Sequence, residues 1–135
     1  MTHIVPYLTF DGNCREAMNF YKSCLGGEVR FQTIAETDFA DRCPAGMQQQ
    51  IMHSELIVDH ARLMASDMVQ PEGLKPGNDM AISLDLDSEK NTKSIFEELS
   101  VGGTVIEPLK KAFGNALFGV LKDKYNKVWM FHCEL

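Results

Sequence analysis

A histidine and a glutamate stand two residues apart at His53 and Glu55, a spacing that places both side chains on one face of a β-strand. An imidazole and a carboxylate on a shared face can act as a base with its orienting partner, or can bind a metal ion. Such a pair is also common on solvent-facing strands without any function, so we treat these two residues as secondary candidates. His132 is a further candidate. Strand alternation places it on the same face of the last predicted strand as Val128 and Met130.

The four cysteines, Cys14, Cys24, Cys43 and Cys133, are spread along the 135 residues and form no C-x-x-C pair. We expect reduced thiols, because this spacing is typical of neither a zinc site nor a dense disulfide framework. The chain also contains no G-x-G-x-x-G, G-x-S-x-G or H-E-x-x-H pattern and no phosphate-binding loop. The sequence therefore predicts no cofactor and identifies no catalytic residue. Eight methionines either line an adaptable apolar pocket or fill the core.

Composition and charge narrow the class of partner. Hydrophobic residues make up 44% and charged residues 24% of the chain, which is typical of a globular protein. The net charge of -6, with no basic cluster, argues against nucleic acid and anionic lipid and favours a neutral or cationic small molecule. The sequence has no apolar run long enough to cross a bilayer and no signal peptide at its first residues, so we expect a cytoplasmic protein with no membrane contact.

The elements that must position the candidate residues follow from turn signals and apolar spacing. Residues 3–10 alternate as a strand. Because Pro6 has no N–H for a β-ladder, we expect this strand to lie at a sheet edge or to be paired on one side there. Asn13 is expected to cap a helix that runs to about Leu25 and ends at the glycine pair 26–27. The rest of the first half is expected to contain strands at 28–35, 51–58 and 62–66, a polar loop at 36–50, and a linker at 70–79.

The same order of elements starts again after the linker. The second half is expected to contain a strand at 80–86, a helix from Ser88 to about Leu99, a glycine stop at 102–103, and strands at 104–109, 117–122 and 127–133. An offset of 76 pairs Asp87 with Asp11 and the second glycine stop with the first, and near the ends of the halves an offset of 66 pairs Met130 with Met64. This regularity predicts a duplication: one domain, 1–135, of two modules at about 1–69 and 77–135.

The segment MNFYKSCLGGEV at the first helix exit and the terminal hairpin FGVLKDKYNKVWMFHCEL resemble the PhnB-like branch of the vicinal oxygen chelate superfamily. The resemblance covers essentially the whole chain. It implies an α+β fold, the glyoxalase and bleomycin-resistance fold, in which two β-α-β-β-β modules form a cupped mixed sheet around a cavity. It also implies a homodimer, which agrees with the small size of the chain.

Metal-dependent members of that superfamily carry His or Glu ligands on the first and last strand of each module. The resemblance places the corresponding positions of this chain at Val5, Ala81, Met64 and Met130. Valine and alanine have no donor atom, and a thioether is a poor ligand for the hard or borderline divalent ions that this chemistry uses. We therefore predict no metal. The alternative is a metal-dependent lyase, isomerase or dioxygenase-type enzyme with a displaced site around His53, Glu55 and His132.

Strand alternation predicts which side chains line the cup. In the strand MAISLDL, Met80 and every second residue after it are expected to pack under the helix, with Phe20 and Phe96 in equivalent core sites. The predicted ligand-binding residues are Tyr7, Thr9, Met64, Ser83, Asp85, Met130 and His132. This surface is apolar at its centre and has a few polar groups that can orient a ligand. The sequence thus predicts that the cup between the modules binds a small apolar or cationic organic molecule.

Overall fold

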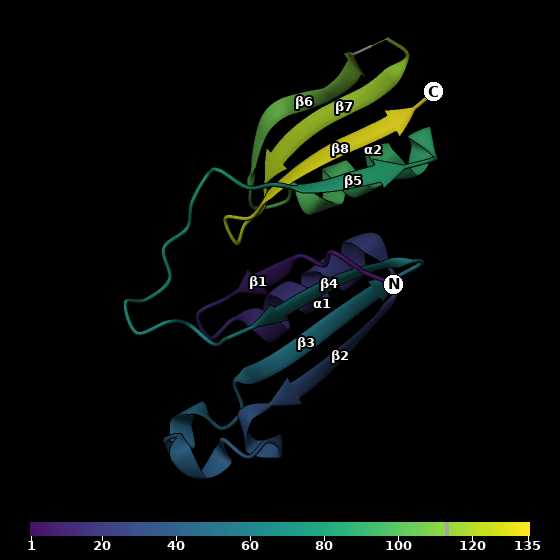
Figure 1. Ribbon diagram of the computed structural model, residues 1–135. Helices are drawn as coiled ribbons and strands as arrows, with labels where there is room; N and C mark the ends of the chain where they lie inside the picture. The colour runs from purple at the N-terminus through teal and green to yellow at the C-terminus, as the bar shows by residue number, and fades with distance from the viewer. Residues whose placement is uncertain (113) are drawn as a thin grey trace. The chain divides into compact units, whose positions relative to one another are not determined.

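The computed structural model describes residues 1–112 and 114–135, and the chain divides into two compact units, Met1–Lys75 and Pro76–Leu135 (Figure 1). The division falls inside the predicted linker at 70–79. The described part of the chain contains no helix with the length and apolar character needed to span a membrane.

The first unit is a four-stranded mixed sheet with one α-helix across one face (Figure 1). Its strand order is β1-β4-β3-β2, with β1 and β4 parallel and the other pairs antiparallel. The elements are β1 (Tyr7–Thr9), α1 (Cys14–Leu25), β2 (Glu28–Thr33), β3 (Ile51–Val58) and β4 (Ala61–Ser66), with three 3-10 turns at Ile34–Glu36, Ala40–Arg42 and Ala45–Met47. The predicted edge position of the first strand is confirmed within this sheet, since β1 pairs only with β4.

The second unit repeats this arrangement with strand order β5-β8-β7-β6 (Figure 1). Its elements are β5 (Ile82–Leu86), α2 (Glu89–Leu99), β6 (Thr104–Ala112), β7 (Ala116–Lys122) and β8 (Val128–Glu134). Again the first and last strands are parallel and the other pairs are antiparallel. Two mixed sheets, each with its own helix, confirm the predicted α+β fold.

The strand registers follow the two offsets that relate the halves of the sequence. Tyr7 lies opposite Met64 in the β1·β4 ladder, and Ser83 lies opposite Met130 in the β5·β8 ladder. Ser83 is Tyr7 shifted by 76, and Met130 is Met64 shifted by 66. The two parallel ladders therefore have the same register, although the loops that precede their last strands differ in length.

The paired glycines lie at corresponding helix exits. Gly26 ends α1 with φ 80°, and Gly102 follows α2 with φ 76°, a backbone region that glycine adopts without steric cost. The second glycine of each pair lies against the backbone of a neighbouring strand: a Cβ on Gly27 would overlap the carbonyl oxygen of Ile57, and one on Gly103 would overlap that of Lys122. Both positions therefore require glycine for the same physical reason.

The core of the first unit lies between α1 and the sheet. Its fully buried side chains include Phe10, Cys14, Ala17, Met18, Tyr21, Ile34, Ile51, Leu56 and Ala65. The expected core site of Phe20 is wrong: this ring is only half-buried, because the apolar face of α1 runs through its neighbours Met18, Tyr21 and Cys24. The offset of 76 equates Phe20 with Phe96, but the buried residues of α1 and α2 do not follow that offset.

The N-terminus of α1 is capped by a residue far away in the sequence. Asn13 occupies the cap position but makes no side-chain cap bond. Instead the buried carboxylate of Asp67 accepts hydrogen bonds from the backbone N–H of Gly12 (3.0 Å) and Cys14 (2.9 Å), and its second oxygen accepts from the N–H of Ile51 (2.9 Å). One side chain therefore joins the end of β4, the start of β3 and the start of α1.

The second unit has an aromatic core under α2. Phe96 is buried, as predicted, and its ring meets that of Phe131 edge-on with centroids 5.0 Å apart. Trp129 is also buried, and its Nε1–H donates to the carboxylate of Asp123 in the β7–β8 turn (2.8 Å). Unlike α1, α2 is capped locally, because the Ser88 hydroxyl accepts from the N–H of Asn91.

The starts of the two first strands differ from the prediction. Ile4 is 98% exposed and Met80 is 80% exposed, so neither packs under a helix. Both residues precede the strands β1 and β5, which begin only at Tyr7 and Ile82. Alternation holds only where a segment is paired in a ladder, and these residues lie before the paired stretch.

Candidate functional site

Each sheet has a face opposite its helix, which we call the helix-free face. In the first sheet, one row of directly opposite residues crosses all four strands. Its members are Tyr7, Met64, Glu55 and Arg30. Their strand neighbours Leu8, Ala65 and Leu56 alternate toward the helix, and Ala65 and Leu56 are buried. The row therefore lies on the helix-free face. Since His53 and Thr9 are each two residues from a member of the row on its strand, they share that face.

Tyr7 and His53 form a pair on this face. The phenol oxygen lies 3.3 Å from Nδ1 of the imidazole, and the rings stack with centroids 5.8 Å apart. The two residues come from β1 and β3, on either side of β4. The secondary candidate His53 thus lies beside the primary candidate Tyr7.

Glu55 has a basic partner that the sequence analysis missed. Arg62, across the β3–β4 hairpin, donates from its guanidinium to the Glu55 carboxylate at 3.0 Å. The register of this hairpin places Arg62 opposite Ile57, diagonal to Glu55. The two-residue spacing between Arg62 and Met64 indicates that they share a face, but it does not indicate that Arg62 meets Glu55. Met64, half-buried, lies directly opposite Glu55 on the same face.

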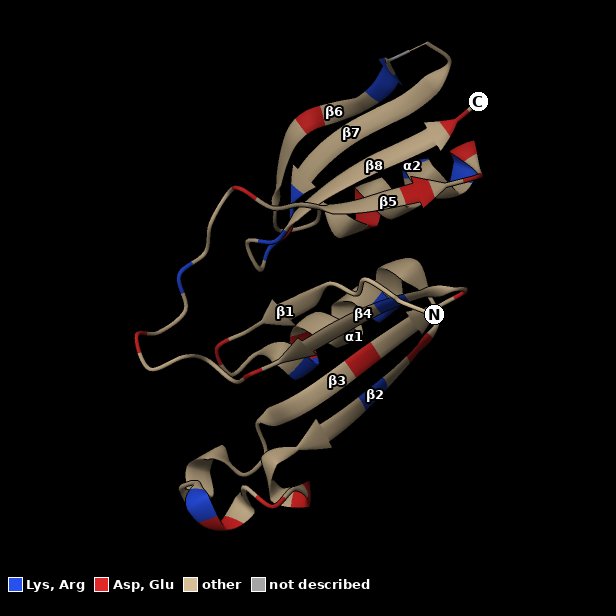
Figure 2. Cartoon of the chain, viewed as in Figure 1, with Lys and Arg blue, Asp and Glu red and all other residues tan. Residues whose placement is uncertain are grey.

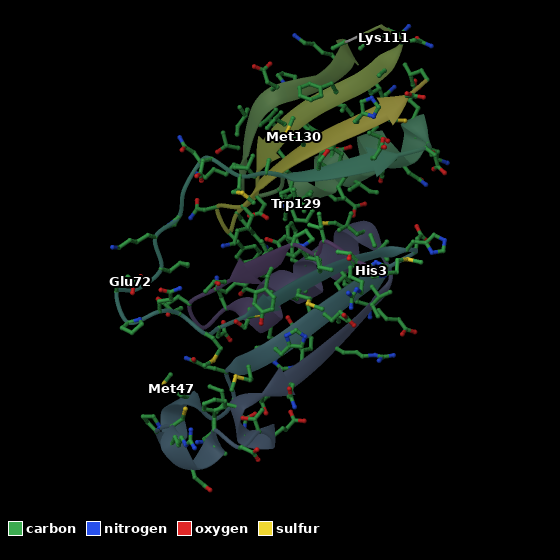
Figure 3. All side chains as sticks on the ribbon, viewed as in Figure 1. His3, Met47, Glu72, Lys111, Trp129 and Met130 are labelled. Atoms are coloured by element: carbon green, nitrogen blue, oxygen red, sulfur yellow. The ribbon has the colours of Figure 1, made fainter. Side chains whose placement is uncertain are left out.

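The helix-free face of the second sheet carries Ser83, Asp85, Met130 and His132. Their neighbours on β8, Trp129 and Phe131, are buried, whereas Met130 is half-buried. Figure 3 labels Trp129 and Met130 in this unit. Asp85 and His132 are directly opposite in the parallel ladder, and the imidazole Nδ1 lies 2.9 Å from the carboxylate Oδ1. Phe118, which the sequence analysis also missed, is opposite His132 on the other side.

The two helix-free faces carry the same residue type at one register position of the parallel ladder and different residue types two residues further along. Met64 and Met130 hold the same register position beside the first strand of their sheet. At the next position outward, the first sheet pairs Thr9 with the buried Ser66, whereas the second pairs Asp85 with His132. An ionisable pair of this kind therefore occurs at this register position only in the second unit.

The residues that the resemblance places at metal-ligand positions have side chains that do not suit a metal ion. Val5 and Ala81 lie just before β1 and β5 and offer no donor atom, and Met64 and Met130 offer only thioethers. Within residues 1–112 and 114–135, no three His, Cys, Asp or Glu side chains form a group that could hold a metal ion. His53 and Glu55 belong to the first unit and His132 to the second.

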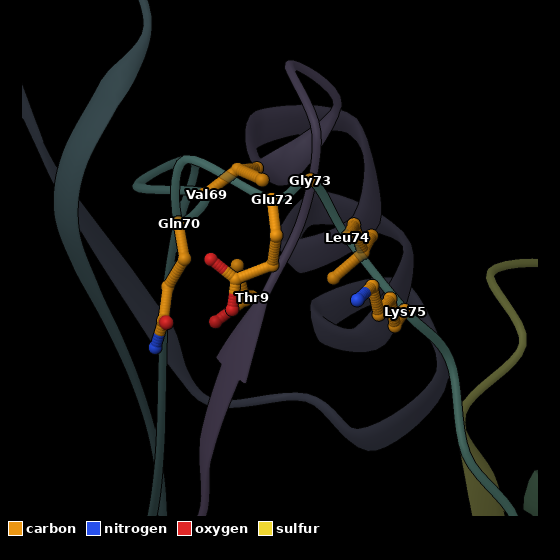
Figure 4. A pocket seen from close by; sticks show the side chains of 7 residues that line it. All are labelled: Thr9, Val69, Gln70, Glu72, Gly73, Leu74 and Lys75. Carbon is orange, nitrogen blue, oxygen red and sulfur yellow. The ribbon is translucent and has the colours of Figure 1, made fainter.

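A shallow hollow of about 220 Å³ lies in the first unit at the end of β1 (Figure 4). Its lining residues are Thr9, Val69, Gln70, Glu72, Gly73, Leu74 and Lys75. Thr9 is the predicted site residue among them. The hollow is made mainly by an exposed segment that follows β4 rather than by the helix-free face.

Charged side chains are scattered over both units, with acidic and basic residues interspersed (Figure 2). All four cysteines are free thiols, and Cys14, Cys24 and Cys133 are buried. Burial raises the pKa of the Cys14 thiol to about 11, an effect only partly offset by its hydrogen bond with Ser54. Such a thiol is a poor nucleophile at neutral pH.

The chain matches one family model and two known proteins over nearly its whole length. Residues 2–131 match the sequence profile of a family described as 3-demethylubiquinone-9 3-methyltransferase. Protein YjdN of Escherichia coli (strain K12) is 29% identical over 136 residues, which cover 94% of this chain and 92% of that protein. The crystal structure of protein PA1353 from Pseudomonas aeruginosa is 37% identical, with a TM-score of 0.86 over 99% of this chain and 98% of that one.

More distant structures share the fold. A putative 3-demethylubiquinone-9 3-methyltransferase, PhnB protein, from Bacillus cereus is 22% identical, with a TM-score of 0.72 over 98% of this chain and 99% of that chain. A glyoxalase/bleomycin resistance protein/dioxygenase family enzyme from Burkholderia phytofirmans PsJN is 13% identical, with a TM-score of 0.64 over 97% of both chains. The same architecture therefore occurs in proteins with quite different descriptions.

Proposed function

Because the chain belongs to the family described as 3-demethylubiquinone-9 3-methyltransferase, the PhnB-like branch of the glyoxalase and bleomycin-resistance superfamily, we propose that it is a metal-free binding protein for a small organic molecule. The ligand lies on a helix-free face of its sheets. It is apolar or cationic, in keeping with the net charge of -6.

The observation that carries this proposal is the composition of the helix-free faces. In both sheets a half-buried methionine holds the central register position, which the resemblance assigns to a metal ligand, and a hydrogen-bonded polar pair lies nearby. Methionine side chains adapt to ligands of different shape, while the polar pairs can fix the orientation of a bound molecule. These are the features of a binding surface for a compact organic molecule.

The methyl transfer in the family description is not part of the proposal. Nucleotide-like cofactors are commonly held by a glycine-rich loop between a strand and a helix, and the sequence has no such motif. The glycine pairs 26–27 and 102–103 instead follow the helices, and their second members pack against neighbouring strands. Their role is structural.

The proposal is tested by thermal unfolding with three probes of similar size: benzyltrimethylammonium, benzyl alcohol and benzoate. We expect the first two to raise the unfolding temperature and the third to leave it unchanged, because a ligand that binds the folded state stabilises it in proportion to RT ln(1 + [L]/Kd). A saturating probe at a hundred times its Kd stabilises by about 2.7 kcal/mol. If the unfolding temperature stays the same with both benzyltrimethylammonium and benzyl alcohol, the proposal is wrong.

The location of the site is tested by Met130→Trp, with Phe96→Ala as the matched core variant. A half-buried side chain at a binding surface accepts added volume, so Met130→Trp should fold nearly as stably as the parent and lose the probe-induced shift. Truncating the buried Phe96 should cost about 3 to 5 kcal/mol of unfolding free energy. If Met130→Trp destabilises as much as Phe96→Ala, Met130 belongs to the core and the site lies elsewhere.

We also propose that the chain forms a homodimer. Each sheet ends in two edge strands, and Ile4 and Met80 are strongly exposed beside β1 and β5. Edge strands flanked by apolar side chains favour association. Light scattering coupled to size-exclusion chromatography should give twice the chain mass of 15.2 kDa, and a mass of one chain contradicts this proposal.

A further inference from the structure

The Asp85 and His132 side chains on the second helix-free face have the geometry of an oriented base. The register of the β5·β8 ladder places the two residues directly opposite each other, and the Asp85 side chain is 83% exposed. Since a carboxylate oxygen accepts but does not donate, the 2.9 Å bond runs from the imidazole Nδ1–H to Oδ1 of Asp85. In the neutral ring the proton therefore lies on Nδ1 and the lone pair on Nε2.

The His132 imidazole is partly exposed. The His132 side chain is 38% exposed, so the ring is held on one edge by Asp85 while solvent reaches the residue. Two apolar side chains flank it on the same face, Met130 on its own strand and Phe118 directly opposite on β7. A small organic molecule over Met130 and Phe118 lies beside this imidazole.

The equivalent position of the first unit has no such pair, since Thr9 and Ser66 occupy it. The imidazole of the first unit, His53, has a phenol rather than a carboxylate at its Nδ1, and a phenol holds a tautomer less strongly. The arrangement thus distinguishes the second unit from the first, although the two share the same topology.

We propose that His132, oriented by Asp85, is a metal-independent general base that removes a proton from a carbon acid bound on the second helix-free face. The inference rests on the proposed binding function and adds a reaction to it. The substrate class is a small neutral molecule with a C–H bond next to an electron-withdrawing group. His132 Nε2 takes the proton, the C–H electron pair moves into the substrate, and no oxidant or reductant is consumed. Asp85 is a positioning residue.

A suitable probe is 5-nitrobenzisoxazole, a neutral aromatic molecule that reports proton abstraction by colour. Its C3–H bond breaks as the N–H bond on the base forms, the electron pair completes a nitrile, and the N–O bond breaks to release a phenolate. The whole protein should accelerate this ring opening over buffer. His132→Ala should lower the protein-dependent rate by about a hundredfold, the lower end of typical general-base contributions.

The matched control is His60→Ala, which removes an exposed imidazole from the β3–β4 turn of the first unit and should leave the rate unchanged. Asp85→Asn should slow the reaction while leaving the fold intact. A readout that a purely structural role would not move is the ¹⁵N NMR signature of His132: Nδ1 should be the protonated nitrogen in the parent protein and should lose that preference in Asp85→Asn. An unchanged tautomer, or equal rates for His132→Ala and the parent, overturns the inference.

The two proposals fail in different ways. If benzyltrimethylammonium or benzyl alcohol still stabilises the protein but His132→Ala opens the probe as fast as the parent does, the base is refuted and the binding function stands. If no probe stabilises the protein and no ring opening exceeds that of buffer, the binding function fails, and the base fails with it.

Discussion

Cys14 is fully buried under the first sheet, where its thiol lies 3.4 Å from the Ser54 hydroxyl. Burial raises the pKa of this thiol from 9.0 to about 11, so between these values the unfolded chain has lost a proton that the folded chain retains. Stability linked to Cys14 is therefore complete below pH 9 and is lost as the pH rises toward 11. Cys14→Ala should flatten the fall in unfolding free energy over this window, measured by denaturant titration.

The control for the Cys14 prediction is Cys43→Ala, which removes a half-buried thiol from the loop between β2 and β3. Burial also lowers the pKa of the Lys127 ammonium, but Lys127 is present in every variant, so its contribution cancels in the comparison. The explanation is wrong if Cys14→Ala and Cys43→Ala show the same slope of stability against pH.

Residue pairs on one strand could be predicted from the sequence, whereas pairs across strands could not. Alternation alone placed Ser83 with Asp85, and Met130 with His132, on shared faces, because side chains repeat every two residues. The bond between Asp85 and His132 depends on the register of two strands 47 residues apart in sequence. Arg62 beside Glu55 was missed for the same reason, since a hairpin register decides which diagonal neighbours meet.

At the scale of elements, Asp67 connects three segments through one carboxylate, and Asp67→Asn tests this role. The amide keeps the shape of the side chain but presents an N–H₂ group to at least one of the three backbone donors, which then lacks an acceptor. A buried donor without a partner costs about 1 to 3 kcal/mol. We expect Asp67→Asn to lose this much unfolding free energy, measured by urea titration.

Asp38→Asn is the matched control for Asp67, because Asp38 is exposed in the loop after the first 3-10 turn. It should change stability by less than about 0.5 kcal/mol, as surface substitutions usually do. Equal stability of the two variants would show that water or a backbone shift replaces the Asp67 bonds. The sequence indicated Asn13 as the cap, and Asp67 was missed because local spacing carries no signal for a cap that comes from 53 residues away.

The second glycine of each helix exit provides a test of equivalence between the elements of the two halves. Gly27→Ala and Gly103→Ala each place a Cβ against a strand carbonyl, so both should destabilise the protein, by about 1 to 3 kcal/mol as for other overpacked sites. Gly46→Ala is the control, since a Cβ there meets no atom within 4 Å. Thermal and urea unfolding measure all three variants. If only one of the first two is destabilised, the helix exits are not equivalent in solution.

Most element boundaries followed from local signals, and the exceptions have physical causes. The strand at 51–58 lies where its apolar pattern and flanking turn residues placed it. β6 runs three residues beyond the predicted end at Leu109, because its pairing with β7 continues past two register irregularities. β1 is shorter than its alternating pattern, since β1 pairs with β4 alone. Pairing partners, rather than propensity, set these limits.

At the scale of the whole molecule, the two units share one topology but divide the candidate chemistry between them. The first carries Tyr7 with His53 and Glu55 with Arg62, and the second carries Asp85 with His132. Because the sheet is duplicated, each register position occurs once in each unit. A residue in one unit can therefore carry chemistry while its counterpart in the other unit keeps a packing role. The central methionines, like the glycine pairs at the helix exits, are positions at which the two units remain alike.

The last prediction concerns the metal content of the protein. Val5 and Ala81 offer no donor, and thioethers such as Met64 and Met130 bind hard or borderline divalent ions poorly. Protein purified without a histidine tag should therefore contain far less than one Zn, Ni, Fe or Mn ion per chain by plasma mass spectrometry. Incubation with EDTA should leave both the benzyl alcohol shift and the ring opening of 5-nitrobenzisoxazole unchanged.

One tightly bound ion per chain, with ring opening lost on chelation and restored by that ion, would instead establish a metal-dependent enzyme. Substituting His53, Glu55 and His132 one at a time would then show whether these side chains hold the ion, because loss of a true ligand lowers the metal content as well as the rate.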